Sequence, residues 1–145
     1  MKTYIGTKII EAEPEKRGEE TGFKVSYPDG YVSWSPTQPF EEAYRGNGQL
    51  NFGHALEMLK RGHRVARSGW NGKGMWLVLV PGTAKAQLRE GTPYREATGL
   101  DECEILPHID MWTINAEGRR AMLPGWLASQ SDMLADDWRV LEEGE

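Results

Sequence analysis

The most regular pattern of hydrophobic and polar positions lies in the segment NFGHALEMLKRG, residues 51–62. Four apolar side chains recur there at spacings of i, i+3, i+4 and i+7: Phe52, Ala55, Leu56 and Leu59. These spacings place the four side chains on one face of an α-helix. Asn51 is a favourable N-cap, and Gly62 suits the position after the helix end. The pattern therefore predicts one amphipathic helix.

Short hydrophobic runs after this helix predict β-strands. The runs are HRVARSGW (63–70), MWLVLV (75–80), ILPHIDMWTI (105–114) and WRVLE (138–142). A turn at NAEG closes the third run, and RRAMLPGW follows it. Residues 81–104 are polar and irregular, so we expect no regular element there. Ser129 followed by Asp132 resembles a capping box, which predicts one or two helical turns.

The first 45 residues show a shorter, β-rich pattern. TYIGTKII (3–10) is typical of a strand, and the charged residues 11–22 are typical of a solvated loop. FKVSYPDGYVSW (23–34) predicts two strands joined by a Pro-Asp-Gly turn. In residues 35–45, a possible N-cap at Thr37, a proline in the first turn and two glutamates predict a short helix.

The glycines of RGNGQ mark a boundary between these two regions. We expect a small β-hairpin and helix module at 1–45, a linker at 46–49 and a larger domain at 50–145. Fewer than fifty residues hardly bury an independent core, so the module should pack on the rest of the chain or on a neighbouring subunit. The predicted fold class is α+β, an antiparallel β-sheet with one main amphipathic helix.

Composition narrows the classes of function. The 145-residue chain has a net charge of −5, which argues against a protein that binds DNA or RNA polymers, because these usually carry a basic face. The longest apolar run has the length of a strand, which argues against a membrane span, and the first residues lack a secretory signal pattern. A single cysteine, Cys103, fits a reducing cytoplasm.

Signals for catalysis are weak. The three histidines form no recognised metal-ligand spacing, so we predict no metal site. Cys103 lies in the acidic stretch DECE, which disfavours a reactive thiolate, and no Gly-x-Ser-x-Gly elbow is present. Asp132, Asp136 and Asp137 could supply an acid and base pair, but a capping role for the first and a solvated turn for the others are favoured.

The stretch SGWNGKGMW, residues 68–76, combines tryptophan with a glycine-rich turn. It lacks the spacing of a Walker motif, so a hairpin turn is favoured over a phosphate-binding loop. Four of the six tryptophans have polar or turn residues beside them: Trp70, Trp112, Trp126 and Trp138. Aromatic faces beside hydrogen-bonding groups suit recognition of a nucleobase. A tryptophan-rich core with an interface is an equal alternative for each of them.

Three segments of the chain resemble the small phage proteins of the second Thoeris anti-defence family. They are NFGHALEMLKRGHRVARSGWNGKGMWLVLVPG, LPHIDMWTINAEG and PGWLASQSDMLADDW, within residues 50–142. GWNGKGM and WLASQSDMLADDW are the specific motifs among them. Residues 1–45 are similar to another short phage module of unknown function.

The resemblance implies a non-enzymatic sponge, without a cofactor, in the cytoplasm of the infected bacterial host. Such a protein binds a cyclic ADP-ribose isomer made by the bacterial Thoeris system and holds it without cleavage. Some members also take up cyclic dinucleotides. The family is expected to form homotetramers with ligand pockets between subunits. The chain departs from the family in its module at 1–45 and in its longer, more charged segment 81–104.

Resemblance and residue chemistry together predict a ligand site. Trp70 would stack on the ligand, and Trp126 would belong to a second wall. Loop and cationic contacts are expected from Arg67, Asn71, Gly72, Lys73 and Gly74. Polar contacts are expected from Ser129, Gln130 and Asp132, with Asn51 as a further candidate. We assign five residues to packing: Met75, Leu77, Leu79, Met133 and Leu134.

Three other functions stay open at this point. The chain could be an enzyme that acts on the messenger, a structural or protein-binding phage protein, or a sponge for cyclic di- or oligonucleotides.

Overall fold

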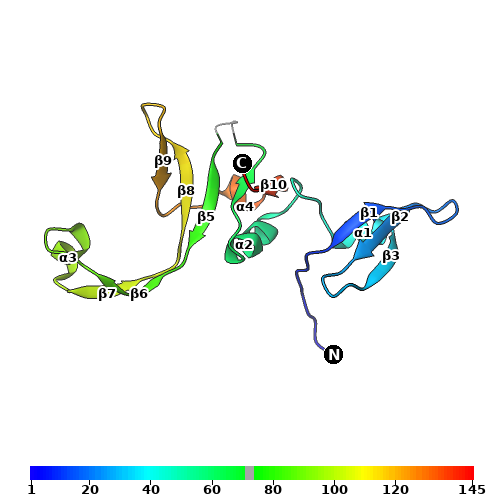
Figure 1. Cartoon of the computed structure of the whole chain (residues 1–145), viewed down its shortest axis with the longest axis horizontal. Coiled ribbons are helices and arrows are strands. Elements are labelled where there is room, and N and C mark those ends of the chain that lie inside the picture. The colour runs from blue at the N-terminus through cyan, green and yellow to red at the C-terminus, as the bar shows by residue number, and fades with distance from the viewer. Residues whose placement is uncertain (71–73) are drawn as a thin grey trace.

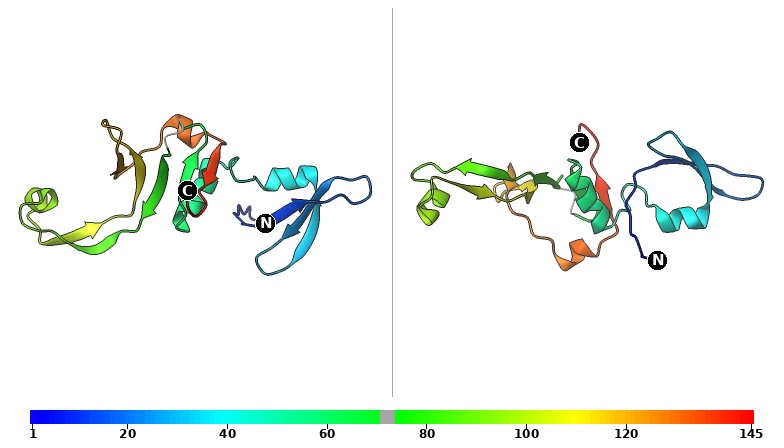
Figure 2. Two further views of the ribbon diagram at one scale, coloured as in Figure 1. Left: turned by 45° about the horizontal axis from the view of Figure 1, so that its top comes forward. Right: turned by 90° about the horizontal axis from the view of Figure 1, so that it is seen from below.

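The structure is a computed structural model that describes residues 1–70 and 74–145. The molecule is elongated, with a five-stranded sheet in the middle, a three-stranded module at one end and a two-stranded arm at the other (Figure 1). Two further views show the same arrangement (Figure 2). The elements follow the α+β, antiparallel class predicted from the sequence.

The module is the sheet β1-β2-β3 with helix α1. Its elements are β1 (Glu11–Pro14), β2 (Gly22–Ser26), β3 (Val32–Pro36) and α1 (Thr37–Ala43). The predicted hairpin is confirmed, because β2 and β3 pair antiparallel on either side of the Pro-Asp-Gly turn. Gly30 there has φ 90°, which glycine adopts without strain. Among the described residues of the module, Val25 is the one fully buried apolar side chain.

Three predictions for the module are wrong. Residues 3–10 form no strand, and β1 lies in the segment predicted as a solvated loop. A strand needs a partner for its backbone, and β2 provides one for β1, supported by an ion pair of 3.2 Å between Lys24 and Glu13. Thr37 is the first helical residue, not the cap; Pro36 holds the N-cap position, and the Thr37 hydroxyl donates to Thr21 instead.

The central sheet has the strand order β10-β4-β5-β8-β9, with every neighbouring pair antiparallel. The strands are β4 (Val65–Arg67), β5 (Trp76–Val80), β8 (His108–Ile114), β9 (Arg120–Leu123) and β10 (Trp138–Val140). These positions confirm the strands predicted around the glycine-rich loop and after it.

Helix α2 (Phe52–Lys60) covers one face of this sheet and confirms the predicted amphipathic helix. The Asn51 side chain accepts a hydrogen bond of 2.8 Å from the His54 amide, so Asn51 is the N-cap. The buried residues of the helix pack with those of the sheet in one core: Ala55, Met58, Leu59, Val65, Leu77 and Trp138.

The segment predicted to be irregular, 81–104, instead forms a long arm. Strands β6 (Thr83–Gln87) and β7 (Glu102–Ile105) pair with each other, and helix α3 (Pro93–Thr98) lies between them in the chain. A Cβ on Gly82 would collide with the Ile105 carbonyl, so glycine is required where the arm begins. Both faces of the arm are mostly exposed, and its sequence therefore lacks the alternation that marks a half-buried strand.

The C-terminal elements confirm two local predictions and correct one. Ser129 and Asp132 form a capping box at the start of α4 (Gln130–Met133), and β10 follows. Leu77 is buried and Leu79 packs against the core, as assigned. Met133 and Leu134 are not packing residues, because their exposed fractions are 42% and 77%. α4 is only one turn long and leaves these side chains outside the core.

The segment that joins the module to the central sheet lies against β10. The Asn47 side chain accepts from the Val140 amide at 2.7 Å and donates to the Val140 carbonyl at 3.0 Å. Arg45 forms an ion pair of 2.6 Å with Asp136. These contacts connect residues about ninety positions apart and attach the joining segment to the larger part of the chain.

Replacement of Trp138 should cost the most stability of any tryptophan change. Its side chain is completely buried, and its Nε1 donates to the Asp132 carbonyl at 3.0 Å. Trp138→Ala should lower the free energy of unfolding by about 3–5 kcal/mol in a urea titration. The exposed Leu100→Ala, in the arm, serves as the control and should change it by less than about 0.5 kcal/mol. Equal effects of the two variants would contradict this core.

Candidate functional site

Arg67, at the end of β4, is the centre of a network of ion pairs. Its Nη1 donates to Asp132 at 2.8 Å, and its Nε donates to Asp137 at 2.9 Å. The Arg67 side chain is only 17% exposed. The hydrogen bonds that Arg67 donates to Asp137 and then to Asp132 raise the pKa of Arg67, which keeps the guanidinium charged. One cation thus joins β4 to α4 and to the residue before β10.

Asp132 receives four hydrogen bonds through its two carboxylate oxygens. Oδ1 accepts from Arg67 and from Trp70 Nε1 at 3.1 Å, and Oδ2 accepts from the Ser129 amide at 3.1 Å and hydroxyl at 2.9 Å. Burial by itself would raise the pKa of Asp132, but the donors from Arg67, Ser129 and Trp70 outweigh burial and lower it. Asp132 is therefore ionised and internally satisfied at neutral pH.

Asp137 holds the backbone turn that leads to Trp70. Its Oδ2 accepts from the Gly69 amide at 2.7 Å, while the Arg67 hydrogen bond is the main cause that lowers its pKa. A Cβ on Gly69 would lie 2.6 Å from this carboxylate oxygen, so the close approach requires glycine. The network consequently fixes both the backbone before Trp70 and, through Asp132, the Trp70 ring.

Four aromatic rings form a cluster beside this network: Phe52, Trp70, Trp126 and Trp138. The Trp70 ring meets Trp138 edge to face with centroids 5.4 Å apart, and it meets Trp126 at 6.2 Å. Trp138 is core, while Trp70 and Trp126 are partly exposed. Within this cluster, Trp138 is therefore a core tryptophan, whereas Trp70 and Trp126 remain candidates for contact with a ligand.

The structure brings most of the described candidates together. Arg67, Trp70 and Asp132 are in direct contact, Ser129 bonds to Asp132, and Trp126 packs on Trp70. Gln130 is exposed at the start of α4, next to Ser129.

The remaining candidates lie elsewhere or are not described. Asn51 caps α2, where both its side chain and its amide bond to His54. Gly74 is exposed just before β5. Asn71, Gly72 and Lys73 lie outside the described residues.

Two features of the site escaped the sequence analysis. The Arg120 guanidinium lies against Gly74, where an added Cβ would be 2.7 Å from Arg120 Nη2, so a second arginine lies at the end of the glycine-rich loop. Its position follows from the pairing of Ile114 with Arg120 across the β8-β9 hairpin, a register that spacing alone does not provide. The second feature is the exposed apolar group beside the cluster, with Leu127 at 89% and Leu134 at 77% exposure.

The internal contacts change the expected roles of Arg67 and Asp132. Both stay predicted site residues, but their charges already satisfy each other. We therefore expect them to position Trp70 and α4 rather than to meet a ligand directly. Groups outside this network, on the partly exposed Trp126 and the exposed Gln130, are better placed for contact with a ligand.

Fold and site together define a small α+β protein with antiparallel sheets and a tryptophan-lined polar surface. Among residues 1–70 and 74–145, no three metal-binding side chains come close enough to hold an ion, and no helix is long and apolar enough to cross a membrane.

This chain belongs to the Thoeris anti-defense 2-like family, whose sequence model matches residues 50–141. It is 37% identical over 93 residues to the protein Thoeris anti-defense 2 of Bacillus phage SP01, a match that covers 64% of this chain and 96% of that protein. The resemblance of the motifs is thereby confirmed. Family membership supports a phage role against Thoeris defence and implies an interaction with the Thoeris signalling system.

Because of the Arg67 network, the free energy of unfolding should fall as the pH becomes acidic. The pKa values of Asp132 and Asp137 are lower in the folded chain than the usual value of about 3.9. Their contribution to stability is therefore complete above about pH 5 and is lost as the pH falls through 3.9 toward the folded values. Asp137→Asn should lower the free energy of unfolding at pH 7 by about 1.5 kcal/mol and flatten its decline between pH 5 and pH 3.

Urea titrations across this pH range provide the measurement. Glu143→Gln is the matched control, because Glu143 is exposed and lies outside the network. An Asp137→Asn protein with the same pH profile as the unchanged chain would refute the role of this ion pair.

Proposed function

We propose that this protein binds and sequesters a cyclic ADP-ribose-type signalling nucleotide without cleaving it and so blocks Thoeris immunity in the cytoplasm of the infected bacterial host. The observation that carries the proposal is the partly exposed pair of Trp70 and Trp126 beside the polar first turn of α4, within the part of the chain that matches the family. Aromatic faces stack on a base, and adjacent hydroxyl and amide groups read its edges and the ribose.

Each group of side chains has a distinct role in this proposal. Trp126 and the exposed part of the Trp70 ring stack on the nucleotide, and Gln130 hydrogen-bonds to it. The Ser129 hydroxyl, which donates to Asp132, can only accept one further hydrogen bond from the ligand. Lys73, which the sequence predicts as a phosphate partner, lies outside the described residues and would bind the phosphates. Arg120 lies beside Gly74 and adds a cation at the same end of the loop.

The lowered pKa values of Asp132 and Asp137 support binding without catalysis. A hydrolytic pair of carboxylates needs one member whose pKa is raised so that it can donate a proton. Asp132 and Asp137 both have lowered pKa values because they bond to Arg67. Sequestration requires only affinity and slow release, which a fixed network supplies by holding the binding surface in one conformation.

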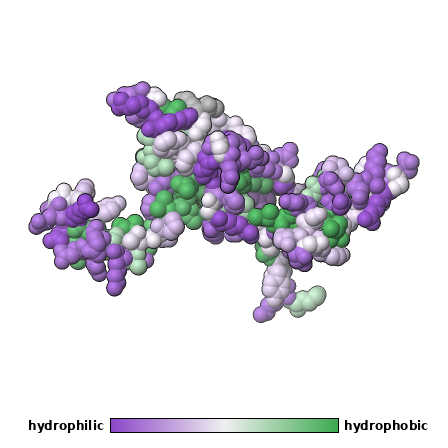
Figure 3. Space-filling view, in the orientation of Figure 1, coloured by the Kyte–Doolittle hydropathy of each residue, from purple (hydrophilic) through white to green (hydrophobic). Residues whose placement is uncertain are grey.

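Assembly into a homotetramer with pockets between subunits is part of the proposal. Leu127, Met133 and Leu134 are exposed beside Trp126 and Ser129, so a neighbouring subunit could both cover them and close the ligand site. On the opposite face of the sheet from α2, Trp76 and Trp112 stack with centroids 5.7 Å apart and remain partly exposed. Hydrophobic residues gather over the middle of the molecule (Figure 3).

A bind-and-recover experiment tests sequestration directly. The protein is incubated with lysate from cells whose Thoeris system is active, washed and denatured, and the released nucleotide is identified by mass spectrometry. We expect an intact cyclic ADP-ribose isomer in stoichiometric amount. Recovery of a linear product would show turnover, recovery of a cyclic dinucleotide would favour the other sponge, and recovery of no nucleotide would indicate a structural or protein-binding role.

Single substitutions test the proposed contacts. Gln130→Ala should weaken nucleotide binding about 3- to 10-fold, the effect of one lost hydrogen bond, because the exposed side chain contributes little to folding. Trp126→Ala should weaken it more, by about 10-fold or above, through lost stacking. Isothermal titration with the recovered nucleotide measures both.

Gln38→Ala in α1 is the matched control for these two substitutions, since its side chain is exposed and bonds only to Glu42 among the described contacts. Unchanged affinity in both Gln130→Ala and Trp126→Ala would place the ligand elsewhere.

A further inference from the structure

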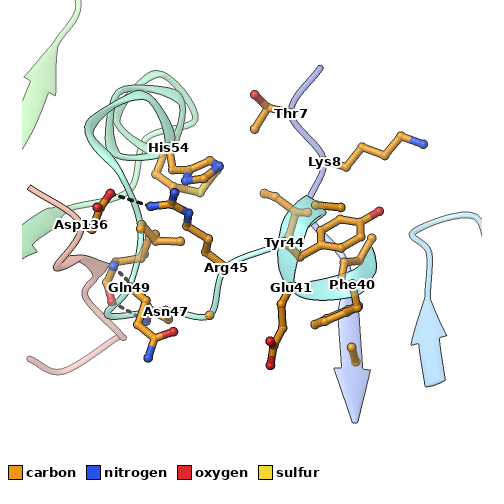
Figure 4. Close-up of a pocket in the computed structure, with 18 of the residues that line it drawn as sticks. Thr7, Lys8, Phe40, Glu41, Tyr44, Arg45, Asn47, Gln49, His54 and Asp136 are labelled. Atoms are coloured by element: carbon orange, nitrogen blue, oxygen red, sulfur yellow. Dashed lines mark hydrogen bonds and ion pairs between the residues drawn. The ribbon is translucent and has the colours of Figure 1, made fainter. Parts of the chain in front are cut away.

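A hollow lies between α2 and the module, away from the candidate site. Its volume is 1330 Å³, and no described candidate ligand residue lines it. The module contributes aromatic side chains, among them Phe40 and Tyr44, and α2 contributes His54 (Figure 4). Met58 of α2 also lines the cavity. Because residues 1–49 lie outside the family match, this cavity combines the family domain with the added module.

The size of the cavity favours a chain segment over a small ligand. Pockets for drug-sized molecules usually measure about 300–1,000 Å³. The aromatic wall is continuous, since Phe23 stacks on Phe40 at 4.1 Å and Phe40 contacts Tyr44 at 5.2 Å. Asn47 and Gln49 also line the cavity and add polar groups to it, although the Asn47 side chain already bonds to Val140. Apolar side chains of an extended peptide would meet the rings, and its backbone would meet these polar groups.

This chain itself contains a segment of matching character. Residues 3–10 have the composition of a strand, yet the structure gives them no partner strand. Tyr4 is 87% exposed and Ile5 is 98% exposed. Residues 6–10 line the rim of the cavity, while residues 1–5 continue away from the module (Figure 1). The same chain would therefore have to reverse direction to fill its own cavity.

Charge also matches the segment to the module. Residues 1–10 contain Lys2 and Lys8 and no acidic side chain. Residues 11–45 contain eight acidic and four basic side chains, which is a formal charge of −4. Glu41 lines the cavity itself. A basic, apolar segment thus has both hydrophobic and electrostatic reasons to lie there.

We propose that residues 1–5 of one copy of this chain insert into the cavity of a second copy. A reciprocal exchange would bury Tyr4 and Ile5 of both copies and would cover the aromatic wall of each module. It also explains how a module with one fully buried apolar residue can persist, because the exchange adds apolar burial that a single copy lacks. The proposal does not depend on the nucleotide function, since none of its contacts involves the candidate site.

Disulfide trapping between two different chains tests the exchange. Both chains carry Cys103→Ser; one, with an affinity tag, also carries Ile5→Cys, and the other carries Ala43→Cys, a cavity-lining and exposed position in α1. The chains are co-expressed, oxidised mildly and separated without reductant. We expect a mixed disulfide dimer at least five times as abundant as with Gln38→Cys, which lies in the same helix but does not line the cavity.

Three trapping results would overturn the proposed exchange of residues 1–5 between copies. Equal trapping at positions 43 and 38, or no mixed dimer, overturns the exchange. A double variant with Ile5→Cys and Ala43→Cys in one chain separates closure within a copy from exchange between copies. A disulfide found only within single chains would also overturn the proposal.

An independent measurement uses Tyr4→Asp combined with Ile5→Asp. These side chains are exposed, so the chain should still fold, and its far-ultraviolet spectrum verifies this. The dissociation constant for association through the module, measured by analytical ultracentrifugation, should rise at least tenfold, while nucleotide binding stays within twofold. Unchanged association overturns the exchange, and absent nucleotide binding in both proteins would count only against the proposed function.

Discussion

One guanidinium organises the family domain. Arg67 binds Asp132 and Asp137, which lie 65 and 70 residues further along the chain. All three side chains are partly or mostly withdrawn from water, so removal of either aspartate would leave Arg67 with one counterion in place of two and would lower the stability of the fold. The position of α4, the turn at Gly69 and the Trp70 ring all depend on this contact.

The sheet and its single covering helix determine what surface remains. α2 packs on one face, where Trp138 and Leu77 are fully buried. The edge of the aromatic cluster, the exposed leucines near α4 and the Trp76–Trp112 stack all lie outside that core. So small a core with so much apolar surface is typical of chains that bind a ligand or further subunits. The proposed nucleotide site and the proposed segment exchange use different parts of this surface.

Features that depend on neighbouring residues follow from the sequence, whereas features that depend on a distant strand partner do not. Asn51, Ser129 and the Pro-Asp-Gly turn act through residues two to four positions away, and each was predicted correctly. The arm at 81–104 was missed because its strands are exposed on both faces and show no periodicity. Residues 3–10 were misread for the opposite reason, since a strand-like composition does not create a partner strand.

The sequence indicated which residues belong to the candidate site better than it indicated what each residue does there. Motif resemblance indicated Trp70, Trp126 and Ser129, and the structure places them together. It could not indicate that Asp132 is saturated by four donors. The number of donors around a carboxylate depends on which strands meet, and no spacing within one motif encodes that.

The sequence by itself determined the N-caps of α2 and α4, the hairpin turn, the family and the set of residue types available to the site. Only the tertiary structure decided that the Arg67 guanidinium binds two aspartates, that Arg120 lies beside Gly74, and that residues 1–10 lack a strand partner. The physical reason is the distance along the chain over which each kind of interaction acts. Caps and turns arise from dihedral preferences and hydrogen bonds within a few residues, whereas ion pairs and strand pairs form between segments that only the folded chain brings together.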